Sequence, residues 1–364
     1  MTATSTAPAT VRQRHAGKPT VDELLAAAVG AVPGGMDRPG QRTMATAVAE
    51  AAATGEHLLV QAGTGTGKSL AYLVPALLVE GPVVVSTATL ALQSQLVDHD
   101  LPRLVDAVEP LLRKRPTFAV LKGRHHYLCL AKLDGGVEDE PQDALFDGDG
   151  QRPTTWLGEA GRLGKQIQRL RDWAMETETG DRDELDPGVD EVAWRQASMP
   201  ARECVGVARC GYGAECLAEA SRARAREADI VITNHSLLAV DMLASRHILP
   251  EHRLLIIDEA HELADRVSSA SQAELTPELI GKAARRARPV VGPDRAGALT
   301  DAGDLLNLGL AEVSPGRLTD GLPTTLGEAL TLIDAAARSA FEAVGEVKSD
   351  DRDAITKQQA RTIL

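Results

Sequence analysis

The chain has 364 residues, of which 43% are hydrophobic and 25% charged, a composition typical of a soluble globular protein with two or three domains. No run approaches the roughly 20 apolar residues of a membrane-spanning helix, and residues 1–19 lack the apolar core of a secretory signal, so we expect a disordered leader there. The net charge of −13 excludes a uniformly basic surface but allows a local basic groove on an acidic body.

Two helices are expected before residue 55. The first spans 20–31, TVDELLAAAVGA, with Thr20 as its N-cap and two acidic residues in its first turn. The second starts near the sequence RPGQ at 38–41. Gln41 there could offer both a donor and an acceptor to an adenine edge. A glutamine at a helix start is more often a surface residue, but its place shortly before the next motif favours the nucleotide role.

Residues 57–69, HLLVQAGTGTGKS, predict a phosphate-binding loop. His57–Gln61 is expected to be a short buried strand, and Lys68 and Ser69 open an apolar helix, which is the context that such a loop requires. The backbone N–H groups of the loop would form an anion cradle, with Lys68 on the β/γ-phosphates and Ser69 on Mg²⁺. A glycine-rich turn without a ligand is the alternative. The expected nucleotide-binding residues are Gln41, Ala62, Gly63, Thr64, Gly65, Thr66, Gly67, Lys68 and Ser69.

The next segments predict further strands of the same sheet. Pro82–Thr87 is an apolar, β-branched strand, and Thr89 begins a helix, either as its N-cap or as a holder of nucleic-acid phosphates. Another strand, TFAVLKG at 117–123, leads into KGRHHYLC, a dense basic and aromatic patch. Residues 133–151 are acidic and glycine-rich, and we expect a mobile surface loop. An amphipathic helix at 155–177 should bury the following residues: Trp156, Leu163, Ile167, Leu170 and Trp173.

Four cysteines, enough for one metal site, lie at Cys129, Cys204, Cys210 and Cys216. The last three recur at intervals of six, whereas structural zinc prefers cysteine pairs two to four residues apart. Iron–sulfur clusters use four cysteines at wider spacings and are therefore favoured over zinc. Independent buried thiols are a third interpretation. The helix after the last cysteine carries Arg222, Arg224 and Arg226, which would face either phosphates or solvent.

Two further buried strands are expected, and the second of them ends in the expected catalytic carboxylates. DIVITN at 229–234 is one strand, and HRLLIIDEAH gives another that ends in Asp258 and Glu259. Downstream of a phosphate-binding loop, such a pair manages Mg²⁺ and the attacking water. Asp258 would hold Mg²⁺, and Glu259 would act as the general base. His261 would couple the bound nucleotide to the rest of the motor protein.

Taken in order, RPGQ, AGTGTGKS, STATLALQSQL, KGRHHYLC, C-x₅-C-x₅-C, ADIVITNHSLL and DEAH resemble the DinG/XPD family of iron–sulfur superfamily 2 DNA helicases, most closely its bacterial DinG-like branch. The resemblance covers residues 20–270. It implies that Cys129, Cys204, Cys210 and Cys216 bind a [4Fe–4S] cluster in a domain inserted into the first motor domain. It also implies ATP-driven 5′→3′ movement along single-stranded DNA in DNA repair or replication. Gln61 departs from the Glu often found there.

The resemblance implies an α/β fold, a RecA-like motor with a mostly parallel sheet and two insertions. The expected divisions are a leader at 1–19, helicase domain 1 at 20–124 and 223–272, an iron–sulfur domain at 125–222 and the start of a helical Arch-like insertion at 273–364. The expected partners are single-stranded and forked or displaced-strand DNA, with no membrane, and the expected state is a monomer in the cytoplasm, at the nucleoid.

No second motor domain is recognisable in the sequence, so we expect the amino-terminal portion of a longer helicase, without the arginine fingers of that domain. Because an arginine finger contributes roughly 10³–10⁵ in rate in related P-loop enzymes, the chain alone should bind ATP with little turnover, which a DNA-stimulated ATPase assay would check. The basic residues expected along a DNA path are Lys122, Arg124, Arg202 and Arg222–Arg226, with Tyr127 either stacking on a base or packing. A helicase–nuclease or regulatory relative and an inactive nucleic-acid- or partner-binding module are the alternative functions.

Overall fold

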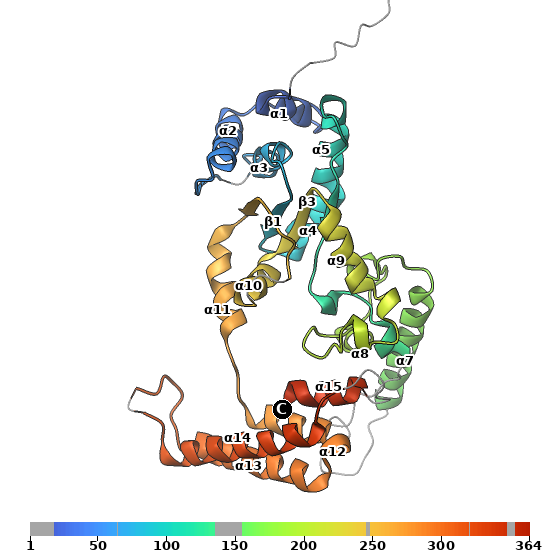
Figure 1. Ribbon diagram of the computed structural model, residues 1–364, viewed down its shortest axis with the longest axis vertical. Coiled ribbons are helices and arrows are strands. Elements are labelled where there is room, and N and C mark those ends of the chain that lie inside the picture. The colour runs from blue at the N-terminus through green and yellow to red at the C-terminus, as the bar shows by residue number, and fades with distance from the viewer. Residues whose placement is uncertain (1–17, 64, 135–154, 245–247, 320, 348–353) are drawn as a thin grey trace, which may run out of the picture. The chain divides into compact units, whose positions relative to one another are not determined.

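The computed structural model describes residues 18–63, 65–134, 155–244, 248–319, 321–347 and 354–364, and the side chains of 155–160 lie outside that description. The chain divides into two compact units. The first, here the sheet unit, lies within 1–121 and 224–270, and the second, the helical unit, within 122–223 and 271–364. Figure 1 traces the elements of both along the chain. The leader expected at 1–19 falls almost wholly outside the described residues.

A four-stranded parallel sheet forms the centre of the sheet unit. Its strands are β1 (Val83–Thr87), β2 (Phe118–Val120), β3 (Ile230–Asn234) and β4 (Leu254–Ile257). Their order is β2-β3-β1-β4, and every pairing is parallel. Val83 pairs with Ile230 on one side and Leu254 on the other. The carboxyl ends of these strands therefore meet at one edge of the sheet, and the expected mostly parallel α/β sheet is confirmed.

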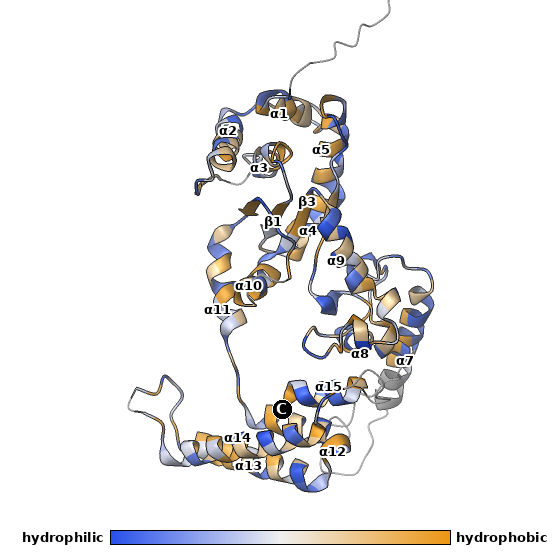
Figure 2. Cartoon of the chain, viewed as in Figure 1, coloured by the Kyte–Doolittle hydropathy of each residue, from blue (hydrophilic) through white to orange (hydrophobic). Residues whose placement is uncertain are grey.

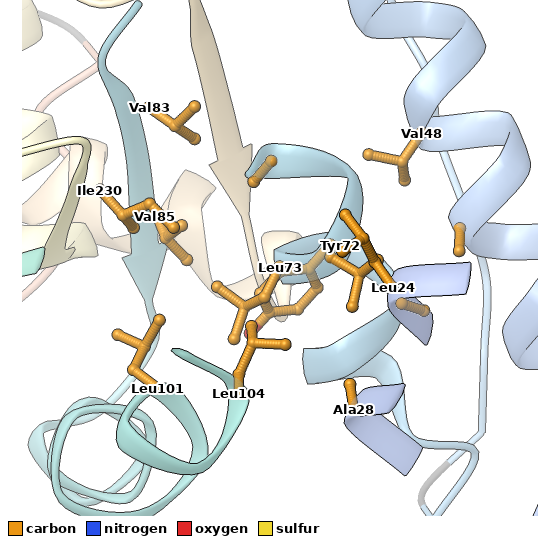
Figure 3. Packing of buried hydrophobic residues seen from close by; sticks show 14 of the residues in the cluster. Leu24, Ala28, Val48, Tyr72, Leu73, Val83, Val85, Leu101, Leu104 and Ile230 are labelled. Atoms are coloured by element: carbon orange, nitrogen blue, oxygen red, sulfur yellow. The ribbon is translucent and has the colours of Figure 1, made fainter. Parts of the chain in front are cut away.

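Helices cover both faces of this sheet because successive residues of a strand point to opposite faces. Val83 and Val85 pack in one hydrophobic cluster, whereas Val84 between them packs in another. The first cluster takes in α1 (Val21–Gly30), α2 (Pro39–Thr54), α3 (Lys68–Ala76) and α5 (Leu101–Val108). The second takes in the end of α9 (Leu217–Glu227) and α10 (His235–Leu243). Figure 3 shows part of the first cluster, and Figure 2 shows the apolar strands in orange.

Polar side chains start the early helices as the sequence predicts. Thr20 Oγ1 accepts the Glu23 N–H at 3.3 Å, and the Glu23 carboxylate accepts the Thr20 N–H at 2.8 Å. This capping box satisfies two backbone donors that the helix itself leaves unpaired. Thr89 accepts the Leu92 N–H at 3.2 Å at the start of α4 (Leu90–Gln95). Thr89 is therefore a helix cap, one of its two expected roles. A π-helical turn (Leu96–Asp100) joins α4 to α5.

The strand expected at His57–Gln61 is wrong. These residues form no strand, and the side chains of Leu58, Leu59 and Val60 are 44%, 92% and 40% exposed. An apolar run predicts a buried strand only if a neighbouring strand offers its edge and both faces are covered. Within the described parts of the chain, β4 pairs with β1 alone and its other edge takes no further strand.

The helical unit has its own cores. One packs α6 (Leu130–Asp134), α7 (Thr155–Ala174) and α8 (Glu191–Ala197) around the fully buried Leu170 and Trp194. The amphipathic helix expected at 155–177 is thus confirmed as α7, with Ile167 and Leu170 buried and Leu163 and Trp173 packed against them. Trp156 is among the side chains outside the description, and most of the acidic segment expected at 133–151 also lies outside it.

Four further helices belong to this unit: α12 (Pro277–Val291), α13 (Pro293–Ala311), α14 (Thr324–Val344) and α15 (Ala354–Ile363). They share one hydrophobic core, and both hydropathy colours alternate along α13 and α14 in Figure 2.

The remaining helix of the sheet unit is α11 (Leu263–Ser271). Short 3₁₀ turns occupy Glu109–Leu111, Arg124–His126, Arg182–Glu184, Val207–Arg209, Gly213–Glu215 and Ala260–Glu262. Of the helices described, none has the length and apolar character needed to cross a membrane.

Candidate active site

The glycine-rich loop before α3 is held by two side chains from the start of α2. Arg38 donates to the carbonyl oxygen of Gly65, and Gln41 Nε2 donates to that of Gly67 at 2.9 Å. Gly65 and Gly67 have φ values of 75° and 79°, a left-handed conformation that favours glycine. A Cβ on Gly67 would lie 2.2 Å from Gln41 Nε2, so a side chain at this position would displace the Gln41 amide.

Gln41 is 5% exposed, and the structure therefore shows it as a brace of the loop. Its contact with an adenine edge stays a prediction. Thr66 Oγ1 donates to the Gly63 carbonyl oxygen at 2.9 Å and closes the loop from within. Thr64, also expected to bind nucleotide, lies outside the described residues.

Lys68, the first residue of α3, forms an ion pair with Glu259. Its Nζ lies 2.5 Å from Glu259 Oε1, although the two residues are 191 positions apart in sequence. Their side chains are 24% and 33% exposed, so solvent screens this pair in part. The hydrogen bond from Lys68 lowers the pKa of Glu259 below its ordinary value. The fold thus brings together the cation expected to hold phosphates and the carboxylate expected to act as the base.

The carboxylate of Asp258 is oriented on both of its oxygens. The hydroxyl of Tyr72 donates to Asp258 Oδ2 at 3.2 Å, and the Glu259 N–H donates to Oδ1 at 3.1 Å. Burial and the charge of Asp258 raise the pKa of Tyr72 well above its ordinary value, whereas a hydrogen bond with Ser69 acts in the opposite direction. The phenol therefore stays protonated and remains a donor. Of the two expected magnesium ligands, Asp258 accepts the hydrogen bond of the Tyr72 hydroxyl and Ser69 lies one turn before Tyr72 on the same helix.

Asp100, at the end of the π-helical turn, lies near Ser69. Burial raises the pKa of this carboxyl, and a hydrogen bond with the Ser69 side chain opposes that shift. π-helical turns occur often at functional sites. Neither Tyr72 nor Asp100 was recognised from the sequence. Tyr72 follows Ser69 by three residues on one helix, a spacing that places both on one face, and that signal could have found it.

The turn that carries the carboxylates has an unusual backbone. Glu259 has a φ of 51°, the only positive value of a non-glycine residue in the described ranges. Such residues cost of order 1–3 kcal/mol and persist where the surrounding structure fixes them, often at functional sites. His261 lies at the surface, with its side chain 72% exposed and Nδ1 3.7 Å from Glu259 Oε2. Its coupling role remains a prediction.

His235 is a buried residue that sequence reasoning did not single out. It is 0% exposed, and its Nδ1 lies 2.7 Å from Ser86 Oγ at the end of β1. Burial lowers its pKa, although the backbone of Asp258 and Glu259 lies near enough to oppose that shift. The imidazole thus packs between β1 and the turn that carries Asp258 and Glu259, the expected catalytic carboxylates.

The second candidate site, a cavity in the helical unit, is lined by all four cysteines. Other parts of its wall are Arg124, Tyr127, Met199 and Tyr212. Gly206 N–H donates to Cys204 Sγ at 3.4 Å, and Arg124 Nη1 donates to Cys216 Sγ at 3.6 Å. Burial raises the pKa of Cys129 to about 11.

The chemistry of this cavity fits an iron–sulfur cluster. Across the described residues, no three His, Cys, Asp or Glu side chains converge as they would around one metal ion. In a [4Fe–4S] cluster each thiolate binds a different iron, so the four sulfurs surround a cavity instead of one ion. Hydrogen bonds to the sulfurs, of the kind that Gly206 and Arg124 make here, are among the features that tune such clusters.

Two basic residues expected along a DNA path are paired with carboxylates inside the helical unit instead. Lys122 is 7% exposed and pairs with Asp181 at 2.6 Å and Asp183 at 2.7 Å, so its charge is neutralised inside the unit. Burial lowers the pKa of Lys122, but the two aspartates outweigh it and the net shift is upward. Arg124 pairs with Glu219 beside the cysteines. These two assignments are wrong because a charge pattern does not reveal where its counter-charges fold.

Tyr127 takes the packing role of its two expected roles. It is 3% exposed, and its hydroxyl lies 2.7 Å from Ser221 Oγ and accepts the Lys122 N–H at 3.2 Å. Arg222 pairs with Glu219 at 3.2 Å. The side chains that remain at the surface as expected are those of Arg202, Arg224 and Arg226.

Comparison with known proteins fits this geometry. The family model described as DEAD/DEAH box helicase matches residues 39–105. ATP-dependent helicase DinG of Mycobacterium tuberculosis (strain ATCC 25618 / H37Rv) is 52% identical over 309 residues, which cover 82% of this chain and 45% of the relative. ATP-dependent DNA helicase YoaA of Escherichia coli (strain K12) is 37% identical over 243 residues, 65% of this chain and 35% of the relative.

A solved structure named XPD_Helicase has a TM-score of 0.46 and 16% sequence identity, and the match covers 90% of this chain and 50% of that structure. The chain spans less than half the length of the curated relatives it matches. Over the part that aligns, the chain is similar to the ATP-dependent helicases DinG and YoaA, and its residues 39–105 belong to the DEAD/DEAH box helicase family.

Proposed function

We propose that this chain binds ATP with Mg²⁺ and forms part of an ATP-dependent DNA helicase that moves 5′→3′ on single-stranded DNA. The observation that carries the proposal is that the helix with Lys68 and Ser69, which follows a glycine loop, meets the turn with Asp258 and Glu259 through the Lys68–Glu259 pair and the Tyr72–Asp258 hydrogen bond. These groups come from α3 and from the turn after β4, at the carboxyl edge of a parallel sheet, where α/β folds bind their ligands. Relatives named ATP-dependent helicases support the same activity.

Each residue has a separate task in this mechanism. The N–H groups of Gly63–Lys68 cradle the phosphates, and Lys68 leaves Glu259 to contact the β/γ-phosphates as a point charge. The oxygens of Ser69 and Asp258 are hard donors that suit Mg²⁺, which supplies charge neutralisation on the phosphates when bound. Glu259, once free of Lys68, is the base that accepts a proton from the attacking water.

The cysteine cavity would hold a [4Fe–4S] cluster through Cys129, Cys204, Cys210 and Cys216. All four line one cavity, and two of the sulfurs accept hydrogen bonds, which supports this assignment. We further propose that the substrates are single-stranded and forked or displaced-strand DNA, bound by exposed arginines such as Arg224 and Arg226. We also propose that the protein is a monomer and acts at the nucleoid. Contacts of this kind neutralise phosphates and should weaken as salt is added.

A competition assay tests the nucleotide site. A fluorescent ATP analogue should bind the chain saturably in Mg²⁺, and both ATP and ADP should displace it. AMP should not, because the loop and Lys68 contact phosphates beyond the first. Gly67→Ala should weaken binding by at least roughly tenfold, because alanine is strained at this φ and its Cβ meets Gln41.

A chain that binds no nucleotide, or binds AMP as well as ATP, would contradict this assignment. Binding of single-stranded DNA by such a chain would then favour the alternative of a nucleic-acid-binding module without a motor.

A further inference from the structure

Tyr72 joins the hydrophobic core of the sheet unit to the expected magnesium-binding groups. Its side chain is 2% exposed, and Figure 3 shows it among Leu73, Leu24 and other core residues. Its hydroxyl leaves this core and reaches Asp258 Oδ2 at 3.2 Å. The position of the hydroxyl is therefore fixed by the packing of the ring.

Ser69 lies one helical turn earlier on α3, and its side chain lowers the pKa of the Tyr72 hydroxyl. The other oxygen of Asp258 accepts the Glu259 N–H at 3.1 Å. Both oxygens of the carboxylate thus have a partner, one from the core and one from the turn itself. The turn alone cannot set the distance from Asp258 to α3, because it belongs to another element of the fold. Tyr72 spans these two elements.

We propose that Tyr72 is a positioning residue for Mg²⁺, holding Asp258 and Ser69 in the relative orientation in which both can coordinate the ion. The inference rests on the proposed nucleotide function and adds to it a residue outside the phosphate loop and the DEAH sequence. Ligands held before the ion arrives lose less rotamer freedom when it binds. Partners of metal ligands typically change metal affinity by about 10–100-fold when they are removed.

Magnesium titration of nucleotide binding tests this role without any need for turnover. The affinity of the chain for a fluorescent ATP analogue is measured in EDTA and at rising Mg²⁺ concentration. Tyr72→Phe keeps the ring and removes only the hydroxyl. We expect the Mg²⁺ concentration that gives half of the gain in nucleotide affinity to rise roughly tenfold. The affinity measured in EDTA should stay within about twofold of wild type, since the phosphate loop is untouched.

Thr233→Val is the matched control. Thr233 is fully buried in β3, and its hydroxyl donates to the Leu121 carbonyl oxygen at 3.0 Å, so the variant also loses one buried hydroxyl from the sheet unit. Its magnesium requirement should equal that of wild type. Tyr72→Met, a second variant without the hydroxyl, replaces Tyr72→Phe if thermal unfolding shows that the latter does not fold.

The two failures are distinguishable. An unchanged magnesium requirement in the Tyr72 variants, or equal losses of affinity in EDTA and in Mg²⁺, would overturn the positioning role and leave nucleotide binding in place. A wild-type chain that binds no nucleotide at all would overturn the proposed function and this inference with it.

Discussion

Cys204→Ser should remove the iron from this protein. Purified without oxygen, the wild-type chain should carry about four irons and as many acid-labile sulfides, as a [4Fe–4S] cluster requires, with the visible absorbance of the cluster. A serine hydroxyl is a hard and weakly acidic donor, whereas iron–sulfur chemistry selects thiolates. Three cysteines would remain around the cavity, one fewer than such clusters normally use.

The contacts of the chain around Cys204 explain why loss of the cluster should also destabilise the protein. The neighbouring Glu203 pairs with Arg286 of α12 at 3.2 Å, and Arg209 donates to the Val347 carbonyl oxygen at 3.1 Å. The segment from 203 to 210 is therefore attached to the helices that follow α11 as well as to the cavity. Because binding of a metal group also contributes folding free energy, the variant should unfold at a lower temperature than the wild-type chain.

Thr331→Ala in α14 is a suitable control in the same unit. Thr331 donates to the Gly327 carbonyl oxygen at 2.8 Å within its own helix and does not line the cavity. It should retain full iron content. Stoichiometric zinc without iron in the wild-type chain would contradict the cluster and leave the nucleotide site unaffected, and equal iron in Cys204→Ser would exclude Cys204 as a ligand.

Short motifs with a fixed local mechanism could be read from the sequence. Thr20 and Thr89 cap helices as expected, and the strands that end in Asn234 and Ile257 form because apolar, β-branched runs are bounded by turns. The DEAH carboxylates follow β4 at the carboxyl edge of the parallel sheet, and Lys68 meets Glu259 there although no strand precedes its loop.

Properties that depend on distant partners could not be read. Lys122 belongs to a basic run but is neutralised by Asp181, whose place in the fold no spacing reveals. Leu58–Val60 are as apolar as β1 yet form no strand and remain largely exposed, which their composition does not reveal. Tyr72 looks like one more core residue of an apolar helix, and only the structure shows its hydroxyl on Asp258. The periodicity of a sequence shows which side chains are apolar, but it does not show which group a single polar atom contacts.

Opposite changes in ATP affinity are expected from the two members of the Lys68–Glu259 pair. In the structure Lys68 Nζ lies 2.5 Å from Glu259 Oε1, so the phosphates of ATP and this carboxylate compete for one ammonium group. Lys68→Ala removes a charge-assisted contact worth about 1.5–3 kcal/mol and should weaken ATP binding roughly 10–100-fold. Glu259→Gln removes the competitor and one negative charge near the phosphates. Because the pair is partly exposed, we expect a gain of about 1 kcal/mol, roughly fivefold in affinity.

The pH dependence of the gain follows from the pKa of Glu259, which the Lys68 hydrogen bond lowers. A lowered pKa means that the carboxylate stays ionised and paired above its ordinary value and is protonated only as the pH falls through the lowered one. The advantage of Glu259→Gln should therefore be constant from about pH 8 down to about pH 6 and disappear only under acid conditions. Equilibrium titration with a fluorescent ATP analogue in Mg²⁺ measures it.

Glu262→Gln separates competition for Lys68 from a general change in charge. Glu262 lies on the same turn, its side chain is 44% exposed, and its carboxylate lies 3.7 Å from His261 Nε2. The variant removes the same charge from the neighbourhood without opening the Lys68–Glu259 pair, so its ATP affinity should stay close to wild type. If both glutamine variants bind more tightly by the same factor, the gain is long-range electrostatics and the pair is not a competitor. If Glu259→Gln binds ATP more weakly, Glu259 supports the bound nucleotide directly, and Lys68 must reach the phosphates without first leaving it.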